Sequence, residues 1–187
     1  MQQGGSSRYV SGPERRAYMD GMSEMSNMYP EHRFVMDNIR DLILEYIKST
    51  NCVVMREAKY KWPEYAESFE PDISLLCGIR HRKKLSYTDV PRFIAEVLSD
   101  STEKDDRGRK MEAYSTVGVQ EYWLVDWRKP YGSVERYMLD DNGETYLLHD
   151  IVEGRADRDV EINILSFPHV VFTMNELMQH IGEDIVE

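Results

Sequence analysis

Apolar and polar residues recur along this chain with two periods, and each period predicts a different kind of element. Between Pro30 and Ile47, apolar residues return every three to four positions, which predicts an amphipathic helix that ends at Ser49-Thr50-Asn51. Pro30 suits the first turn of a helix, and Glu31 complements the positive end of its dipole.

Three shorter apolar runs follow this helix and have the length and composition of β-strands. Residues 52–62 (CVVMREAKYKW) alternate well enough for one strand, and residues 71–77 (PDISLLC) predict a second, with a hairpin or loop between them. Residues 92–98 (RFIAEVL) form a nearly continuous apolar run that one acid interrupts. Such a run is typical of a central strand that is buried on both faces.

A helix and a further strand come next. A helix-start signal at residues 99–102, followed by acids in the first turn, predicts a helix over 103–117 that ends at Gly118. Residues 119–127 (VQEYWLVDW) predict another buried strand. A strand, a helix and a strand in this order predict a parallel, right-handed crossover at the centre of an α/β domain.

The remaining residues predict additional antiparallel structure. Strands near 133–139 and 144–150 are joined by Asp141-Asn142-Gly143, which is a strong hairpin signal, and residues 160–165 predict a further short strand. Thr173-Met174-Asn175-Glu176 has the pattern of a capping box that begins a C-terminal helix. There are no internal repeats.

The composition is that of one soluble globular domain. Of the 187 residues, 41% are hydrophobic and 30% are charged, and no apolar run reaches the roughly 18 residues that a membrane span needs. The first residues lack the apolar segment of a secretory signal, so a cytoplasmic protein is expected. Cys52 and Cys77 lie in apolar stretches and favour buried free thiols over a disulfide.

The charge balance limits how the chain could bind nucleic acid. The net charge is −11, although residues 78–110 hold nine Lys or Arg against six Asp or Glu, a local balance of +3. Residues 135–187 hold three Arg against thirteen acids, a balance of −10. The basic segment Arg80-His81-Arg82-Lys83-Lys84 is either a solvated loop or a phosphate contact. Because a monomer this acidic should not bind duplexes tightly, a homodimer that pools two copies of residues 79–84 is an alternative.

Three polar residues stand where burial would be costly. Glu96 lies in the middle of the apolar run 92–98, where it needs a buried partner or a metal ion. Asp72 precedes the apolar run 73–77, where it is either a turn residue or part of a site. Lys110 could pair with Glu96, or it could form an ordinary salt bridge with Asp106 one helical turn away. Two acids with one lysine can bind a divalent cation and orient a nucleophilic water.

The residues around this set carry a resemblance to a known family. The segment EVLSDSTEKDDRGRKMEAYSTVGVQEYWLVD, preceded by EPDISLL, resembles the Uma2 family of restriction endonuclease-like proteins in the PD-(D/E)XK nuclease superfamily. Tyr18-Met19-Asp20-Gly21 and Pro30-Glu31-His32 are similar to the family's "DG" turn and helix-opening "H", although Ala17 stands near a position where the family commonly has an acid. The likeness implies a flexible tail at 1–12 and a single nuclease-like domain over 13–187. It also implies a restriction-endonuclease-like mixed sheet flanked by helices, with an αβββαβ core and appended antiparallel strands.

The resemblance also implies roles for individual residues. Asp72 and Glu96 match the two acids of the motif and would bind Mg²⁺ or Mn²⁺, with the backbone carbonyl of Val97 as a further ligand. The superfamily usually has its lysine two residues after the second acid, where this chain has Leu98, and the Uma2 likeness assigns the role to Lys110 on the next helix. The further candidates are Asp106 to hold the lysine, Tyr114 to lean toward the site, and Glu57 as either an accessory acid or an edge-strand charge.

Other polar and aromatic residues are assigned packing roles. Tyr122 and Trp123 are expected in the core, and His32 is expected to cap or pack rather than to bind metal. The function favoured by the resemblance is a Mg²⁺-dependent endonuclease acting on DNA. Two alternatives stay open: a catalytically silent module that binds nucleic acid or protein, and metal-dependent hydrolysis of another phosphate substrate.

Overall fold

The computed structural model describes residues 29–79, 82–83 and 86–181. The chain divides into two units, Met1–Pro30 and Glu31–Glu187, and the second contains the β-sheets. The predicted tail, the domain start at residue 13 and the Asp20-Gly21 turn lie outside the described residues, as do Arg80, His81 and Lys84 of the basic segment. In the described part of the chain, no helix is both long enough and apolar enough to cross a membrane.

The predicted first helix is confirmed as α2 (Pro30–Ile47). Its apolar stripe is buried, because Val35, Met36, Ile39 and Ile43 are all fully inaccessible to solvent. These four residues follow the 3.6-residue period that predicted the helix, so the stripe faces the core while the opposite side stays polar.

A six-stranded mixed sheet forms the centre of the fold, in the order β1-β2-β5-β6-β7-β8. Its first four strands are β1 (Cys52–Arg56), β2 (Ile73–Cys77), β5 (Phe93–Val97) and β6 (Glu121–Asp126). Strands β5 and β6 pair in parallel, as the crossover predicts, and the other neighbouring pairs are antiparallel. Every residue of β5 and β6 is buried, which confirms two central strands with no solvent-facing side.

The predicted hairpin extends this sheet beyond β6. It consists of β7 (Ser133–Leu139) and β8 (Tyr146–Glu153), which turn at Gly143 with a positive φ of 72°. Two small sheets lie outside the central one: β9 (Glu161–Ile164) with β10 (Phe167–Thr173), and β3 (Arg82–Lys83) with β4 (Ser86–Tyr87). The predicted capping box is present at the start of α5 (Met174–Leu177). Strand β10 was not predicted from the sequence.

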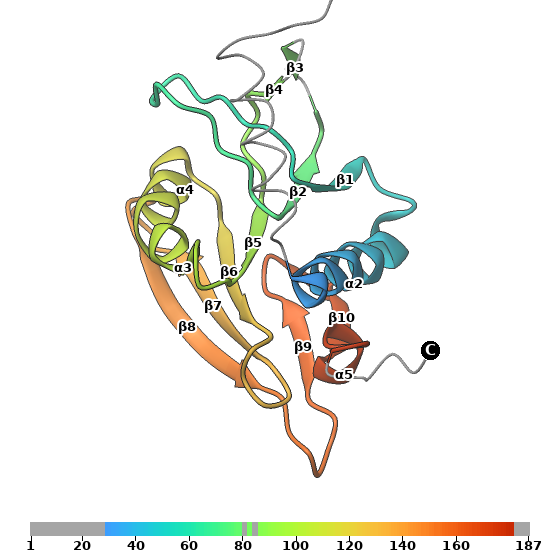
Figure 1. Cartoon of the computed structure of the whole chain (residues 1–187). Helices are drawn as coiled ribbons and strands as arrows, with labels where there is room; N and C mark the ends of the chain where they lie inside the picture. Colours follow the sequence, from blue (N-terminus) through green and yellow to red (C-terminus); the bar gives the residue numbers. More distant parts are fainter. Residues whose placement is uncertain (1–28, 80–81, 84–85, 182–187) are drawn as a thin grey trace, which may run out of the picture. The chain divides into compact units, whose positions relative to one another are not determined.

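Helices and strands cover the two faces of the sheet differently (Figure 1). The helical segment between β5 and β6 lies on one face, where Tyr114 packs against Tyr122 with ring centroids 5.4 Å apart. Helix α2 and the β9–β10 hairpin lie on the other face, where Trp123 packs edge-on against Phe93 and Phe172. Because successive strand residues alternate between faces, neighbouring residues of β5 and β6 belong to two separate environments.

Two sequence expectations about the first hairpin are wrong. The strand predicted over 52–62 ends at Arg56, because Glu57 adopts a positive φ of 48° that turns the chain out of the ladder. Cys52 and Cys77, expected as buried free thiols, form a disulfide and are only partly buried. The two cysteines are direct partners in the antiparallel register of β1 and β2, which sequence spacing did not reveal.

The predicted helix over 103–117 is present but not uniform. It consists of α3 (Glu103–Asp105), a π-helical turn η1 (Asp106–Lys110) and α4 (Met111–Val117). Gly118 ends it in the left-handed conformation with φ of 90°, as its position predicted. The π-helical turn therefore spans the very segment that carries Asp106 and Lys110.

Candidate active site

Glu96 is the centre of the predicted site and lies on the central strand β5. Its side chain is fully buried on the face covered by the helical segment. The Tyr114 hydroxyl donates to Glu96 Oε1 at 2.7 Å, and the Lys110 ammonium lies 3.1 Å from Oε2. The main-chain N–H of Asp72 also donates to Oε2, at 3.3 Å. Glu96 therefore has the buried partners that its apolar surroundings required.

Asp72 reaches the same place from the antiparallel neighbour β2, which begins at the next residue. Its Oδ2 accepts a hydrogen bond of 2.7 Å from the main-chain N–H of Val97 on β5. His32, in the first turn of α2, places its Nε2 3.4 Å from the same oxygen. Asp72 thus joins two strands and a helix rather than simply ending a turn.

Lys110 combines the two alternatives that its sequence position left open. Its ammonium forms the i,i+4 ion pair with Asp106 at 2.8 Å, and it also contacts Glu96. The Lys110 side chain is 16% exposed, whereas that of Asp106 is 1% exposed. The ion pair therefore faces the interior, not the solvated side of the helix.

The electrostatics of this cluster are dominated by burial and by an excess of carboxylates. Burial raises the pKa of Glu96 to about 8, because the Lys110 charge only partly offsets it while Asp72 and Asp106 add repulsion. Burial also raises the pKa of Asp106. For Lys110, burial lowers the pKa, but the nearby Glu96 and Asp106 outweigh it and the net shift is upward. The ammonium is therefore held in its charged form.

The donor set suits a hard divalent cation. The Lys110 ammonium contacts the carboxylates of Glu96 and Asp106, and Asp72 adds a further negative charge near Glu96, so a bound cation would neutralise surplus negative charge. In the part of the chain that the structure describes, no three His, Cys, Asp or Glu side chains gather as a metal-binding group. An ion here would therefore rest on two carboxylates, completed by main-chain, water or substrate oxygens, which is how Mg²⁺ is commonly held.

Two other predicted positions have different outcomes. Tyr114 leans toward the site and binds Glu96 directly, as described above. Glu57 lies one residue beyond β1 and is exposed, and its main-chain N–H donates to the main-chain oxygen of Asp72 at 3.1 Å. The strand position expected for Glu57 is therefore wrong.

Sequence reasoning missed the involvement of two residues. His32 was assigned to capping or packing, yet it is buried beside Asp72. Tyr122 was assigned to the core, which it does occupy, but its hydroxyl also donates to the main-chain oxygen of Asp106 at 2.9 Å. For Tyr122, the residue type itself indicates such a contact, because a buried tyrosine, unlike phenylalanine, needs a partner for its hydroxyl.

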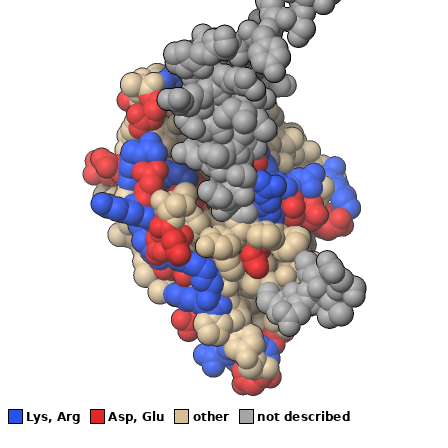
Figure 2. Space-filling view, in the orientation of Figure 1, with Lys and Arg blue, Asp and Glu red and all other residues tan. Residues whose placement is uncertain are grey.

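The positive side chains near the site are largely engaged by acids. Arg107 forms a two-pronged contact with Glu135 at 2.7 and 2.8 Å, and Arg109 binds Asp105 and Glu67. Figure 2 shows Lys and Arg side chains interleaved with Asp and Glu over the described part of that face. On the described surface that Figure 2 shows, the basic residues therefore do not form one continuous basic patch.

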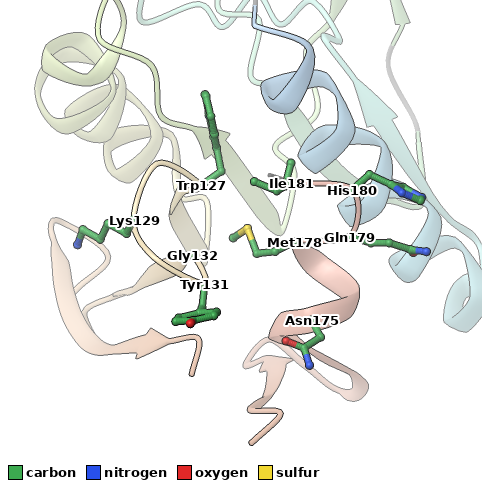
Figure 3. Close-up of a pocket in the computed structure, with 9 residues that line it drawn as sticks. All are labelled: Trp127, Lys129, Tyr131, Gly132, Asn175, Met178, Gln179, His180 and Ile181. Carbon is green, nitrogen blue, oxygen red and sulfur yellow. The ribbon is translucent and has the colours of Figure 1, made fainter. Parts of the chain in front are cut away.

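A cavity of about 400 Å³ lies between the β6–β7 connection and the C-terminal segment (Figure 3). Trp127, Tyr131 and Gly132 line one side, and Asn175, Met178 and Ile181 line the other. Met178 and Ile181 point toward its centre, whereas Lys129 points away. None of the predicted site residues lines this cavity, so it is separate from the acid cluster.

Comparisons with known proteins address the family and the fold. A family model described as "Uma2: Putative restriction endonuclease" matches residues 10–173. The uncharacterised protein slr1290 of Synechocystis is 27% identical over 147 residues, which cover 77% of this chain and 76% of that protein. The crystal structure of a protein from Anabaena variabilis, titled a putative nuclease belonging to DUF820, superposes with a TM-score of 0.63 at 16% identity. That superposition covers 81% of this chain and 82% of the other, and it supports the fold.

Proposed function

Because the chain belongs to the Uma2 family of restriction endonuclease-like proteins, we propose that it is a metal-dependent endonuclease that hydrolyses DNA phosphodiester bonds. The observation that carries the proposal is the convergence of Asp72, Glu96 and Lys110 from three separate elements. A purely structural ion pair would need only one carboxylate and one ammonium group. The additional carboxylates, of buried Asp106 and partly buried Asp72, make the cluster costly unless a cation joins it.

In this proposal Asp72 and Glu96 hold Mg²⁺ or Mn²⁺, with the Val97 carbonyl as a further ligand. When bound, the ion would polarise the scissile phosphate and lower the pKa of a coordinated water. The helix supplies the lysine because Leu98, at the usual lysine position, is fully buried in the core.

Lys110 acts as a cation in this mechanism and not as a base. The raised pKa keeps its ammonium protonated at neutral pH, so it can donate to the attacking water or to a phosphate oxygen but cannot accept a proton. Positive charge placed beside the reacting phosphate stabilises the additional negative charge of the transition state. Asp106 holds the ammonium toward Glu96 through the 2.8 Å ion pair.

The test is cleavage of supercoiled plasmid and of single-stranded circular DNA in Mg²⁺, in Mn²⁺ and in EDTA. We expect Lys110→Met to reduce cleavage at least about 10²-fold, since it removes a preorganised charge. Arg109→Met is the matched control, because Arg109 lies in the same helical turn but binds Asp105 and Glu67 at the surface. Equal cleavage by both variants, or cleavage that persists in EDTA, would exclude the proposed site.

A catalytically silent module that binds nucleic acid or protein is the second candidate. The net charge of −11 disfavours tight binding of a duplex, and Arg107 and Arg109, in the described helical segment, are already paired with acids. If the wild-type protein cleaves nothing, binding of a labelled duplex in Ca²⁺ tests this alternative. The expected homodimer is checked by measuring the mass in solution with and without DNA.

A further inference from the structure

The π-helical turn η1 is the least regular part of the helical segment that carries Lys110. A π turn has poorer hydrogen-bond geometry than an α-helix and occurs mostly as short interruptions, often at functional sites. Here it spans five residues, and its first and last residues are Asp106 and Lys110. The turn therefore sets the spacing of the ion pair that faces Glu96.

The Tyr122 hydroxyl holds the beginning of this turn. Tyr122 is fully buried on β6, and its hydroxyl donates to the main-chain oxygen of Asp106 at 2.9 Å. Its ring is fixed between Tyr114, with centroids 5.4 Å apart, and Tyr146, with centroids 5.6 Å apart. A buried side-chain donor of this kind can satisfy a carbonyl that an interrupted helix leaves without its regular partner.

The same pair of strands carries both the anchor and the acid. Tyr122 is the register partner of Ile94 on β5, two residues before Glu96 and on the same face. The hydroxyl therefore ties the turn to the sheet close to the residue that Lys110 must reach. Arg107 adds a second, partly buried tie from the turn to Glu135 on β7.

We propose that Tyr122 is a positioning residue, whose hydroxyl holds the π-helical turn in the register that presents Lys110 to Glu96. This inference rests on the proposed nuclease function. It assigns the hydroxyl a role in placing the ammonium beside the reacting phosphate, in addition to the packing of the ring. An error of about 1 Å in such a placement costs roughly 10²-fold in rate.

The test compares Tyr122→Phe with Tyr146→Phe. Both changes delete one hydroxyl that donates to a main-chain oxygen, since Tyr146 binds Val119 at 2.8 Å, although the Tyr146 bond is partly buried and the Tyr122 bond is buried. Both rings belong to one aromatic cluster, but Tyr146 binds Val119, just beyond the C-terminal cap of the helix, whereas Tyr122 binds Asp106 in the π-helical turn itself. We expect Tyr122→Phe to lower kcat about tenfold or more with KM changed less than about twofold, while Tyr146→Phe keeps both values.

Amide hydrogen exchange of residues 106–111 gives a second readout that needs no catalysis. We expect these amides to exchange several-fold faster in Tyr122→Phe than in Tyr146→Phe, at similar melting temperatures. Equal kcat in the two variants, or equal exchange across the turn, would overturn the inference. If the wild-type protein cleaves no DNA, the proposed function fails, and the exchange comparison still decides whether Tyr122 holds the turn.

Discussion

Two fully buried glutamates lie on the adjacent parallel strands of this protein and have opposite surroundings. Glu96 on β5 faces Lys110, Asp72 and Asp106 on the side of the helical segment. Glu121 on β6 accepts hydrogen bonds from the Trp123 indole and from the main-chain N–H groups of residues 165 and 166. The first carboxylate is surrounded by charges, and the second by neutral donors.

This difference separates a structural acid from a candidate catalytic one. The three donors satisfy Glu121, and two of them, the main-chain N–H groups of residues 165 and 166, fix the turn of the β9–β10 hairpin to the sheet, which is a complete structural explanation. Glu96 has donors as well, but two further acids share its environment and leave the cluster with excess negative charge. Burial alone therefore does not identify the site, whereas unneutralised charge does.

The largest expected effect is a separation of activity from stability at Glu96. We expect Glu96→Gln to abolish measurable cleavage, a loss of at least about 10²-fold, because the amide cannot replace a carboxylate ligand. Thermal stability without metal should stay equal or rise at pH 8, since the change removes a buried charge. Nuclease assays and calorimetry on the same sample check both. A Glu96→Gln variant that is less stable than the wild type but cleaves equally well per folded molecule would contradict the assignment of Glu96 to the site.

Glu121→Gln should give the opposite outcome. The amide keeps one acceptor but presents an NH₂ group to donors, so at least one buried main-chain N–H loses its partner. We expect a loss of about 1–3 kcal/mol in the free energy of unfolding, with cleavage per folded molecule unchanged. Urea denaturation and the cleavage assay measure the two quantities. A loss of cleavage without loss of stability would place Glu121 in the site, and the distinction between a structural Glu121 and a catalytic Glu96 would fail.

The pH dependence of stability offers a third contrast. The pKa of Glu96 is about 8 in the folded protein and near 4.5 in the unfolded chain, so the unfolded state releases its proton first. Stability in EDTA should therefore be highest below about pH 4.5 as far as Glu96 contributes, and should decline as the pH rises to about 8. The raised pKa of Asp106 acts in the same direction.

The variants separate this contribution from the rest of the protein. We expect Glu96→Gln to flatten the decline between pH 5 and 8, while Glu121→Gln lowers the stability at neutral pH. Denaturation midpoints in EDTA at intervals of pH check this. An unchanged slope in Glu96→Gln would mean that the burial of Glu96 does not control the titration.

The same pair shows how far the sequence could predict the structure. Glu96 and Glu121 both interrupt apolar runs, and only Glu96 was singled out, although both are fully buried. The local pattern predicts that an acid is buried, but its partners come from distant segments, such as residues 165–166 for Glu121. Asp72 and Lys110 were singled out together with Glu96, but their roles came from the family likeness, because neither has a local pattern that distinguishes a site from a turn or a salt bridge.

The elements themselves followed the hydrophobic periods closely, and the exceptions have local causes. Strand β1 ended early at the positive φ of Glu57, and the π-helical turn surrounds Gly108, a residue that weakens an α-helix. The Cys52–Cys77 disulfide depended on the register of two strands separated by a long connection. Register across a long connection is fixed by tertiary packing, so it could not be predicted from spacing.

The smallest expected effect concerns the Tyr114 hydroxyl. It donates to Oε1 of Glu96, whereas Lys110 and the main-chain N–H of Asp72 contact Oε2. Tyr114→Phe removes only the 2.7 Å hydrogen bond to Oε1 and keeps the ring in the core. We expect a change of about 1 kcal/mol or less in unfolding free energy, and a several-fold decrease in cleavage because one carboxylate oxygen loses its orienting contact. Cleavage measured across a range of Mn²⁺ concentrations tests this, since a poorly oriented ligand should raise the Mn²⁺ requirement. A loss as large as that of Glu96→Gln would mean that Tyr114 itself contacts the reacting groups, and Glu96 would no longer be the only buried centre of the site.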